Sequence, residues 1–451
     1  MNGRARFSLR VSLWAYSVLS SSVLYAAAPP LPPGNVSFEG SAVAGGDQVR
    51  SAAAFIDSIG VNTHFNHGNT AYYTKFPLVK QKLLESGITH IRDGAPDKLG
   101  KFPPQDSSAV FRELGTAGIR ASFIFNLNVG TEFVQGYPAR VAPSFEAYEY
   151  PNEFNTKPDW VAALRAWAPV FKSYVRSNPA SAIYPIIGPS LMDLGNNPHT
   201  QLGDLSEFMD YGNIHSYYTS RHPGTLGWGG PGNDGCEQWR YGSLAYKTCG
   251  QRRVSGTKPI MATETGWGTD TTQKNQIPDY LQARYLARML LLHFDAGIAR
   301  TFIYQFVDAG ADGFTAYGLL TAQVEEKPAF REIKALIRLL KDPAGVIPPQ
   351  TSPASVTSSA NTIRVMLFQK RDRTFAMILW LEASGFDPVT LKRIAVPPQS
   401  ATLLLTTGAR VQSVTTFQDD GSPVTTPAQQ DGAAEFTLAV SDNLTIVEIT
   451  R

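Results

Sequence analysis

The sequence is poor in charge, in cysteine and in long apolar runs. Charged residues make up 17% of its 451 residues, below the roughly 25% of an average soluble domain. So little charge argues against a disordered chain and against a coiled coil, both of which carry more. The formal net charge is only +2, too small a basic field for a polyphosphate, so nucleic acid is not an expected partner. After the N-terminus no run of roughly 18 apolar residues occurs, and we expect no membrane span in the mature chain.

The first 28 residues have the composition of a secretory signal. Arg4, Arg6 and Arg10 precede a mostly apolar stretch, Val11 to Leu24, and small residues follow at Ala26 to Ala28. The alternative is a short membrane anchor, but the apolar stretch is too short to span a bilayer. We therefore predict a signal peptide over 1–28 and export to the periplasm or the extracellular space.

Only two cysteines are present, Cys236 and Cys249, and both lie in one Gly-rich stretch. In an oxidising compartment they can close a small loop, so we predict a disulfide; the alternative is two free thiols. A zinc site would need more ligands, and no His lies between the two cysteines. We expect neither a metal nor a cofactor.

A strand followed by a helix recurs about every 35 residues between 50 and 343. Eight such units predict an α/β fold, a (β/α)₈ TIM barrel over 50–343, after an extended linker over 29–49. The rival, a doubly wound open sheet, would usually carry a glycine-rich phosphate loop after its first strand, and GVNTHFN is not one. The predicted strands are 60–62, 88–92, 121–127, 145–149, 182–188, 211–217, 259–263 and 301–306.

After residue 343 the pattern changes. A Pro-rich linker precedes period-2, β-branched segments such as TIRVMLFQKR, TFAMILWLEA and LTIVEIT, separated by turn signals. We predict an antiparallel β-sandwich domain over 344–451. Trp380 is the main aromatic there, and packing against the barrel is the favoured role of this domain.

A barrel places its chemistry at the carboxyl ends of the strands. Glu153, after the fourth strand, and Glu264, after the seventh, face each other across the mouth of an eight-stranded barrel. Two carboxyl groups about 5–5.5 Å apart are what retaining glycoside hydrolysis requires. Glu149 is a competing acid on the fourth strand, but Pro151 makes Asn152–Glu153 the favoured loop pair.

Other polar and aromatic residues near these strand ends are candidates for substrate contact. Asn152 is placed to hold a sugar 2-hydroxyl, while Arg92 and Tyr217 are placed to keep Glu264 ionised. Trp267 and Tyr304 offer flat apolar faces on which a sugar ring can stack. The candidate substrate-binding set is Asn152, Arg92, His215, Tyr217, Trp267, Tyr304, His64 and Asn126.

Four short motifs in order along the barrel resemble those of the clan A glycoside hydrolases. EYPNEFN is similar to their Asn-Glu motif, MATETGWG to their nucleophile motif, IRDG to their strand-2 arginine and NIHSYY to their His-x-Tyr. The resemblance is greatest to cellulase-like families and to the family of β-xylosidases and α-iduronidases. It implies an acid/base role for Glu153 and a nucleophile role for Glu264, with a carbohydrate substrate. In this sequence Phe154 stands where the family commonly has proline, and Tyr304 where it commonly has tryptophan.

Three other functions use some of the same residues. A barrel that binds polysaccharide without catalysis would share the aromatics but would not need both glutamates. A transglycosylase would use the same residues as the hydrolase. A metallohydrolase would require His64, His215 and Glu264 to converge on one ion. Finally, we expect the long stretch from Thr219 to Lys258 to wall the substrate cleft, stiffened by the disulfide; the alternative is a surface excursion with a small core of its own.

Overall fold

The computed structural model describes residues 48–95, 107–308, 316–342, 350–360, 362–428 and 434–451. The predicted signal peptide and all but the last two residues of the predicted linker 29–49 therefore lie outside the described residues. Within the described part of the chain, no helix is long and apolar enough to cross a membrane.

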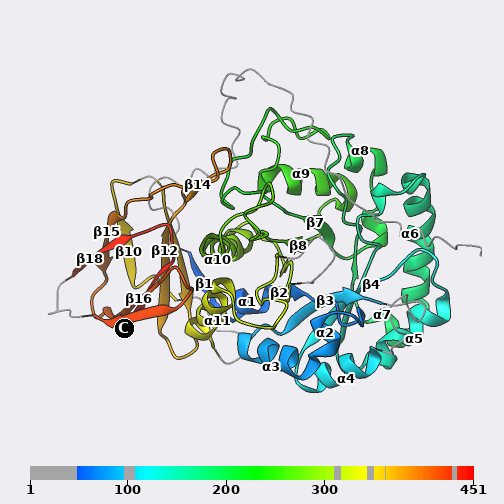
Figure 1. Cartoon of the computed structure of the whole chain (residues 1–451), viewed down its shortest axis with the longest axis horizontal. Coiled ribbons are helices and arrows are strands. Elements are labelled where there is room, and N and C mark those ends of the chain that lie inside the picture. Colours follow the sequence, from blue (N-terminus) through cyan, green and yellow to red (C-terminus); the bar gives the residue numbers. More distant parts are fainter. Residues whose placement is uncertain (1–47, 96–106, 309–315, 343–349, 361, 429–433) are drawn as a thin grey trace, which may run out of the picture. The chain divides into compact units, whose positions relative to one another are not determined.

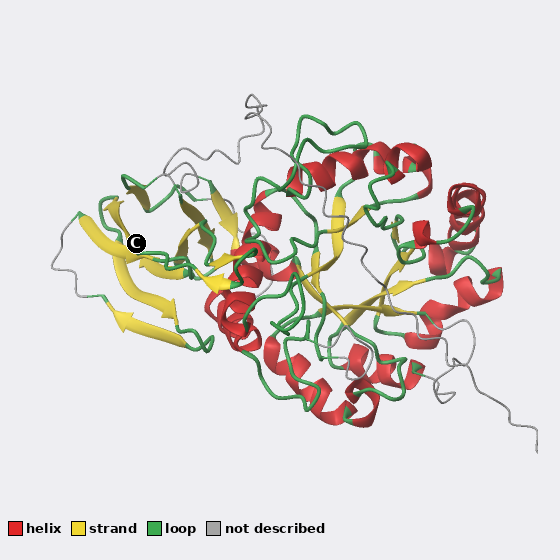
Figure 2. Ribbon diagram, turned by 45° about the horizontal axis from the view of Figure 1, so that its top comes forward, coloured by secondary structure: helices red, strands yellow, loops and turns green. Residues whose placement is uncertain are grey.

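Eight parallel strands form the predicted barrel (Figures 1 and 2), in the order β6-β5-β4-β3-β2-β9-β8-β7. A parallel bridge between Ile187 and Tyr211 joins β6 to the residue before β7, so the sheet closes on itself. The (β/α)₈ prediction is confirmed. The strands are β2 (Ile59–Asn62), β3 (His90–Gly94), β4 (Arg120–Ile124), β5 (Phe145–Glu149), β6 (Ile186–Ile187), β7 (Gly212–His215), β8 (Ile260–Thr265) and β9 (Thr301–Ile303).

Helices surround these strands (Figure 2) and cover them with apolar faces. The chain turns from α3 into β3 at Gly87, whose left-handed φ of 78° ends the helix as the sequence indicates. The helices are α1 (Ala52–Asp57), α2 (Ala71–Thr74), α3 (Phe76–Ser86), α4 (Ser108–Thr116), α5 (Thr131–Val141), α6 (Trp160–Arg176), α7 (Pro179–Ala182), α8 (Pro198–Leu202), α9 (Leu244–Ser255), α10 (Asp279–Asp295) and α11 (Pro328–Leu340), with 3₁₀ turns η1 (Phe154–Thr156) and η2 (Ser206–Phe208).

The C-terminal part is the predicted antiparallel sandwich. One sheet has the order β1-β11-β12-β19-β16-β17 and the other β10-β15-β18, and a short β13-β14 hairpin stands apart. The strands are β1 (Val49–Ser51), β10 (Ala354–Thr357), β11 (Ile363–Gln369), β12 (Phe375–Leu381), β13 (Phe386–Asp387), β14 (Lys392–Arg393), β15 (Gln399–Leu405), β16 (Arg410–Phe417), β17 (Pro423–Pro427), β18 (Glu435–Val440) and β19 (Thr445–Thr450).

Strand β1 joins this sheet from the other end of the chain. It pairs in parallel with β11, Val49 opposite Leu367, and α1 begins directly after it. The Ser51 hydroxyl accepts a hydrogen bond from the Ala54 amide (3.2 Å) and so caps that helix. The chain therefore passes from the C-terminal sheet straight into the barrel.

Strand β12 is buried on both faces, which explains its unbroken apolar sequence FAMILWL. Met377 and Leu379 point into the core between the two sheets, whereas Ile378 and Trp380 belong to the core of the barrel and its helices. An antiparallel sheet with one face in water would alternate apolar and polar residues instead. Barrel and sandwich thus share apolar packing, and their contacts place the described residues of both in one compact unit.

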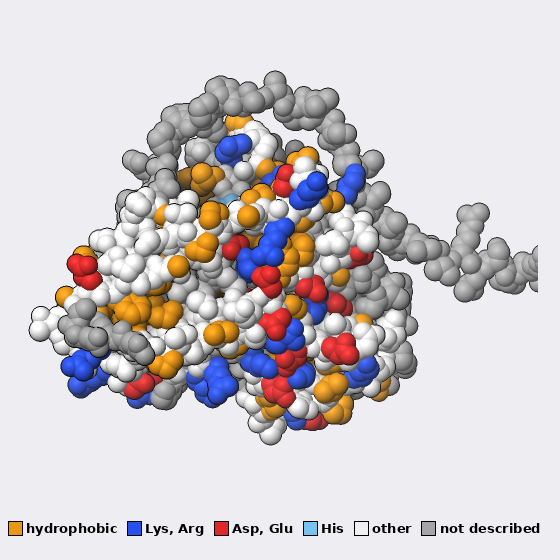
Figure 3. Space-filling model, turned by 60° about the vertical axis from the view of Figure 1, so that its left-hand side comes forward, with side chains coloured by type: hydrophobic (Ala, Val, Ile, Leu, Met, Phe, Trp, Pro, Cys, Tyr) orange, Lys and Arg blue, Asp and Glu red, His pale blue; other side chains and the backbone are white. Residues whose placement is uncertain are grey.

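The surface carries charges of both signs side by side. On the face shown in Figure 3, Lys and Arg side chains lie among Asp and Glu side chains rather than in a patch of one sign. Ion pairs such as Lys82–Glu326 and Lys334–Glu326, both 2.9 Å, follow the same mixed pattern. Exposed pairs of this kind contribute little to stability.

Candidate active site

The polar side chains at the carboxyl ends of the barrel strands form one hydrogen-bonded cluster. Arg92 of β3 lies at its centre, and only 2% of its surface is exposed. It makes two hydrogen bonds to the Glu149 carboxylate, 2.7 and 2.8 Å, and one to Glu264 Oε1, 2.7 Å. It also donates to the side-chain oxygens of Asn62 (2.9 Å) and Asn152 (2.7 Å). A buried guanidinium in such a fork fixes the positions of all four partners.

Glu264 receives hydrogen bonds on both carboxylate oxygens. Arg92 holds Oε1, and the Tyr217 hydroxyl donates to Oε2 at 2.8 Å. His215 Nδ1 lies 3.6 Å from the same Oε2. Burial opposes ionisation, but His215, Arg92 and Tyr217 outweigh it and lower the pKa of Glu264. This side chain is therefore held as a carboxylate.

A bulge between β7 and β8 brings His215 level with Glu264. The pairing register shifts between Ile214 and His215, so that His215 lies opposite Glu264 rather than opposite its regular partner. On its other side, His215 Nε2 lies 3.2 Å from the Thr263 hydroxyl. Burial lowers the pKa of His215, but Glu264 and Glu153 overcome this effect and raise it.

Glu153 reaches the cluster from the loop after β5. Its backbone is left-handed, with φ of 43°, directly before η1. The Asn155 side chain fixes this loop, because it exchanges two hydrogen bonds with the backbone of Met192 (2.7 and 2.9 Å). Glu153 Oε1 lies 2.7 Å from His215 Nδ1.

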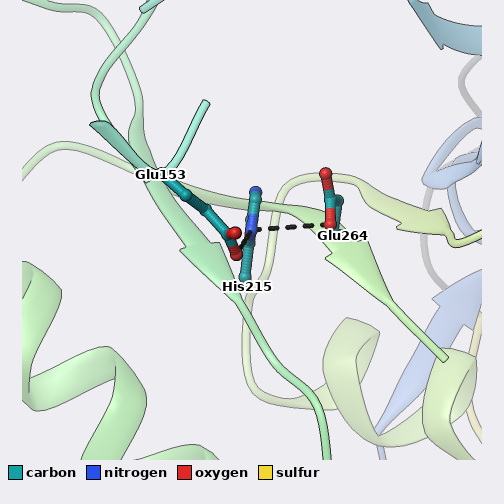
Figure 4. Close-up of side chains that lie close together, drawn as sticks. All are labelled: Glu153, His215 and Glu264. Atoms are coloured by element: carbon teal, nitrogen blue, oxygen red, sulfur yellow. Dashed lines mark hydrogen bonds and ion pairs between the residues drawn. The ribbon is translucent and has the colours of Figure 1, made fainter. Parts of the chain in front are cut away.

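Figure 4 shows His215 between the two carboxyl groups. One carboxylate oxygen of Glu153, one of Glu264 and a ring nitrogen of His215 all lie within 4.8 Å of one another. These are three ligand atoms that a divalent transition metal accepts, so this trio is the part of the described chain that could hold an ion. The trio differs from the set that the metallohydrolase alternative would require, because Glu153 takes the place of His64.

Three tyrosines and a histidine line one side of the cluster. Ring centres lie 6.2 Å apart for Tyr217–Tyr317, 5.9 Å for Tyr317–Tyr304 and 5.8 Å for Tyr304–His64. All four residues are partly exposed. Burial and the neighbouring His67 lower the pKa of His64 to about 3, so its imidazole is neutral. This aromatic wall, Tyr217–Tyr317–Tyr304–His64, offers apolar ring surface beside Glu264.

Two of the predicted contact residues make no hydrogen bond to the described residues of the cluster. Trp267 is 1% exposed; its ring stacks on Tyr218 at 5.7 Å and its indole nitrogen donates to the Arg221 carbonyl (3.0 Å). Trp267 therefore packs beneath the loop after β7. Asn126 follows β4 with an exposed side chain, and no hydrogen bond joins it to the described part of the cluster.

Other residues in the cluster had no assigned role in the sequence analysis. Glu149, considered there as a competing acid, is fully buried and binds Arg92. Asn213 and Thr263 donate to Glu149 Oε1 at 3.0 and 3.2 Å, and Asn62 donates to the Thr263 carbonyl. The sequence did hold a signal for Asn213 and Thr263, since each is a polar residue inside an otherwise apolar strand. It held no such signal for Tyr317, because that residue lies in a loop.

The loop that follows β7 is anchored at several points. The predicted Cys236–Cys249 disulfide is present and joins the loop to α9. Asp234 accepts hydrogen bonds from the backbone of His199 (2.9 Å) and Thr200 (2.7 Å) at the start of α8. The disulfide and these hydrogen bonds attach the loop to α9 and to α8.

Comparison with known proteins gives matches in structure alone. No protein-family model matches the sequence, and no curated protein matches it. A family 39 glycoside hydrolase from the gut symbiont Bacteroides cellulosilyticus WH2 is similar with a TM-score of 0.57 and 16% identity, over 89% of this chain and 82% of that one.

Two further solved structures share the arrangement over nearly their whole length. The GH51 arabinofuranosidase from Xanthomonas axonopodis pv. citri has a TM-score of 0.55 at 12% identity, over 90% of this chain and 97% of that one. A bifunctional glucanase–xylanase from a metagenome library has a TM-score of 0.53 at 10% identity, over 91% and 98%. At such low identity the likeness is one of fold, and at that level the resemblance to glycoside hydrolases is confirmed.

Proposed function

We propose that this chain is a retaining glycoside hydrolase that cleaves O-glycosidic bonds of an oligo- or polysaccharide by double displacement. Its barrel-and-sandwich fold is that of a family 39 glycoside hydrolase, a GH51 arabinofuranosidase and a glucanase–xylanase. Since fold alone does not determine function, the proposal depends on the site.

The spacing of Glu153 and Glu264 is the observation that carries the proposal. Their nearest carboxylate oxygens lie within 4.8 Å of each other. Inverting enzymes keep their carboxyl groups about 6.5–9.5 Å apart to admit a water molecule, whereas retaining enzymes need about 5–5.5 Å. The shorter spacing leaves room for a sugar carbon but not for a water between the carboxylate and that carbon.

In the first step Glu264 is the nucleophile. Its carboxylate attacks the anomeric carbon while the bond from that carbon to the leaving oxygen breaks, and Glu153 gives the leaving oxygen a proton. The lowered pKa of Glu264 favours this role, because only the carboxylate attacks. Arg92 and Tyr217 orient both of its oxygens.

In the second step Glu153 acts as the base. It takes a proton from water, the water oxygen attacks the anomeric carbon, and Glu264 leaves as a carboxylate. His215, 2.7 Å from Glu153, shares a proton with it through both steps. Two inversions at one carbon give a product with retained configuration.

Substrate contacts follow from the same geometry. Arg92 holds the Asn152 side-chain oxygen, which leaves the amide nitrogen to donate to a sugar hydroxyl beside the anomeric carbon. The aromatic wall receives the C–H face of the sugar ring. The sequence indicates export, which would bring the enzyme to polysaccharide outside the cell.

The test is a screen of polysaccharides and aryl glycosides with matched variants. Glu264→Gln should lose about 10³-fold or more in kcat on every substrate. Glu153→Gln should lose about 10²–10⁴-fold on polysaccharides but much less on aryl glycosides whose leaving group needs no proton. Glu146→Gln is the control, since it lies on the same strand β5 at the opposite end of the barrel. Near-parent activity of both active-site variants would overturn the proposal.

Three measurements separate this reaction from its alternatives. NMR of the first product anomer should show retention, and inversion would remove the nucleophile role of Glu264. Saccharide binding without turnover on the whole panel would indicate a binding protein, and products elongated by added sugar acceptors a transglycosylase. Activity should persist after treatment with a chelator; its loss, restored by one metal, would favour metal-assisted hydrolysis through Glu153, His215 and Glu264.

A further inference from the structure

A buried carboxylate of the sandwich accepts hydrogen bonds from the loop that follows β7. Glu382 follows β12 and is 9% exposed. His222 Nδ1 donates to its Oε1 at 2.6 Å, and the Gly224 amide donates to the same oxygen at 3.1 Å. A methyl group added to Gly224 would overlap the Glu382 side chain, so the loop backbone lies directly against it.

The other partners of Glu382 hold it rigidly in place. Arg288 of α10, which is fully buried, donates to Oε2 from Nε at 3.2 Å and to Oε1 from its terminal nitrogen. The Trp380 indole donates to Oε2 at 2.7 Å. Burial would raise its pKa, but Arg288 and His222 hold the pKa of Glu382 far below its usual range. Glu382 is thus a fixed anion on a rigid strand end.

The loop segment 215–224 links this anion to the proposed nucleophile. At its first end the Ser216 amide donates to the Glu264 carbonyl (2.9 Å), and the Tyr217 hydroxyl donates to the Glu264 carboxylate (2.8 Å). Midway, the Arg221 carbonyl accepts from the indole of Trp267, three residues beyond Glu264. At its far end, His222 and Gly224 meet Glu382.

From this continuous path we infer that Glu382 is a positioning residue of the active site: through His222 and Gly224 the C-terminal domain sets the placement of Tyr217 against Glu264. The inference rests on the proposed role of Glu264. It gives the sandwich a part in the reaction, in addition to covering the barrel.

The decisive variants change the loop residues that contact Glu382 and leave Glu382 itself in place. His222→Ala removes one hydrogen bond and touches none of the contacts between Arg288 and Glu382, whereas Gly224→Ala places a methyl group against the Glu382 carboxylate and forces the loop and that side chain apart. If Tyr217 then no longer donates to Glu264, the apparent pKa of the acid limb of the kcat/KM profile should rise by about 0.5–1 pH unit. The reason is that the carboxylate loses a donor that lowers its pKa. His222→Ala should add little to Tyr217→Phe in the double variant, since both act through one contact.

Asp442→Asn is the matched control. Asp442 also joins the sandwich to α10, accepting from Arg284 at 2.7 and 2.9 Å, but none of its hydrogen bonds reaches the loop 215–224. This variant should lower the unfolding temperature without moving the acid limb. Hydrogen exchange of the segment 219–228 should quicken in His222→Ala and stay unchanged in Asp442→Asn, whatever the activity.

The outcomes distinguish the two proposals. An unmoved acid limb in His222→Ala and Gly224→Ala, with a raised limb in Tyr217→Phe, would overturn the positioning role and leave the nucleophile role standing. An unchanged acid-limb pKa in Tyr217→Phe, or full activity of Glu264→Gln, would contradict the nucleophile role of Glu264, on which the positioning role depends. Equal limb shifts in Asp442→Asn and His222→Ala would show a general loss of stability instead of positioning.

Discussion

Arg92 and Glu332 show two fates of a buried charge. Arg92 has four hydrogen-bonding partners, and two of them are the carboxylates Glu149 and Glu264, which balance its charge. Glu332 of α11 is fully buried, and neither of its oxygens has a hydrogen-bond partner among the described residues. Burial raises the pKa of Glu332 to about 8. Arg92 holds its partners in place in the site, whereas a charged Glu332 would destabilise the folded protein.

We therefore predict that Glu332→Gln stabilises the protein at neutral and alkaline pH. Because the folded pKa lies above the unfolded one, the glutamate contributes fully below its unfolded pKa, and this contribution is lost as the pH rises toward 8. The free energy of unfolding of the variant should exceed that of the parent by about 3 kcal/mol at pH 8 and by less than about 1 kcal/mol at pH 5.

Urea unfolding at a series of pH values measures this difference. Glu325→Gln serves as the control, since that side chain is exposed, and it should change neither the stability nor its pH dependence. A difference between Glu332→Gln and the parent that stays constant with pH would contradict the prediction.

At the scale of elements, the loop after β7 is held from several sides. The disulfide ties it to α9, Asp234 ties it to α8, and Glu382 ties it to the sandwich. Such anchoring removes conformational freedom that a substrate would otherwise have to freeze on binding. A loop anchored in this way keeps one shape, as the predicted role in walling the substrate cleft requires.

Replacing both cysteines, Cys236→Ser with Cys249→Ser, should free this loop locally. We expect KM to rise about threefold to tenfold with a smaller change in kcat, because the loop must then be ordered by the substrate. Limited proteolysis should cut the variant between 225 and 240 and leave the parent whole. An unchanged KM together with new cleavage in the loop would show that it does not contribute to the substrate cleft.

The barrel strands were readable from the sequence because each is a short apolar run with a polar end, as in SFEAYEY and IMATET. The glutamate pair was readable for the same reason, since a barrel brings strand ends together. Trp267 was harder to place: its neighbour Glu264 points into the mouth, but its own ring turns under the loop onto Tyr218. Tyr317 and Glu382 come from a loop and from another domain, where no period in the sequence indicates proximity.

At the scale of the whole molecule, the barrel and sandwich share a hydrophobic core. Ile378, Trp380 and Ile446 of the sandwich pack with residues of the barrel helices, and Arg288–Glu382 lies buried between the two parts. Breaking such a pair leaves an uncompensated charge, which typically costs about 3–5 kcal/mol. Neither part is complete alone.

We predict a single cooperative unfolding transition for the whole chain. Scanning calorimetry and circular dichroism should give coincident midpoints, and a chain shortened to end at residue 342 should fail to fold, because it exposes the apolar surface that β12 covers. Two separate transitions, or a soluble and active shortened chain, would show that the barrel is independent.

The pairing of β1 with β11 bears on how the protein is made. Val49 leaves the ribosome about 300 residues before its partner Leu367, so this contact is one of the last to form. Until then β1 and the start of α1 have no sheet to join, and a chain broken off before β11 leaves that edge open. The sheet can therefore be completed only after the C-terminal domain has been translated. In a nascent chain that ends before β11, the segment of β1 stays unpaired and is open to proteases.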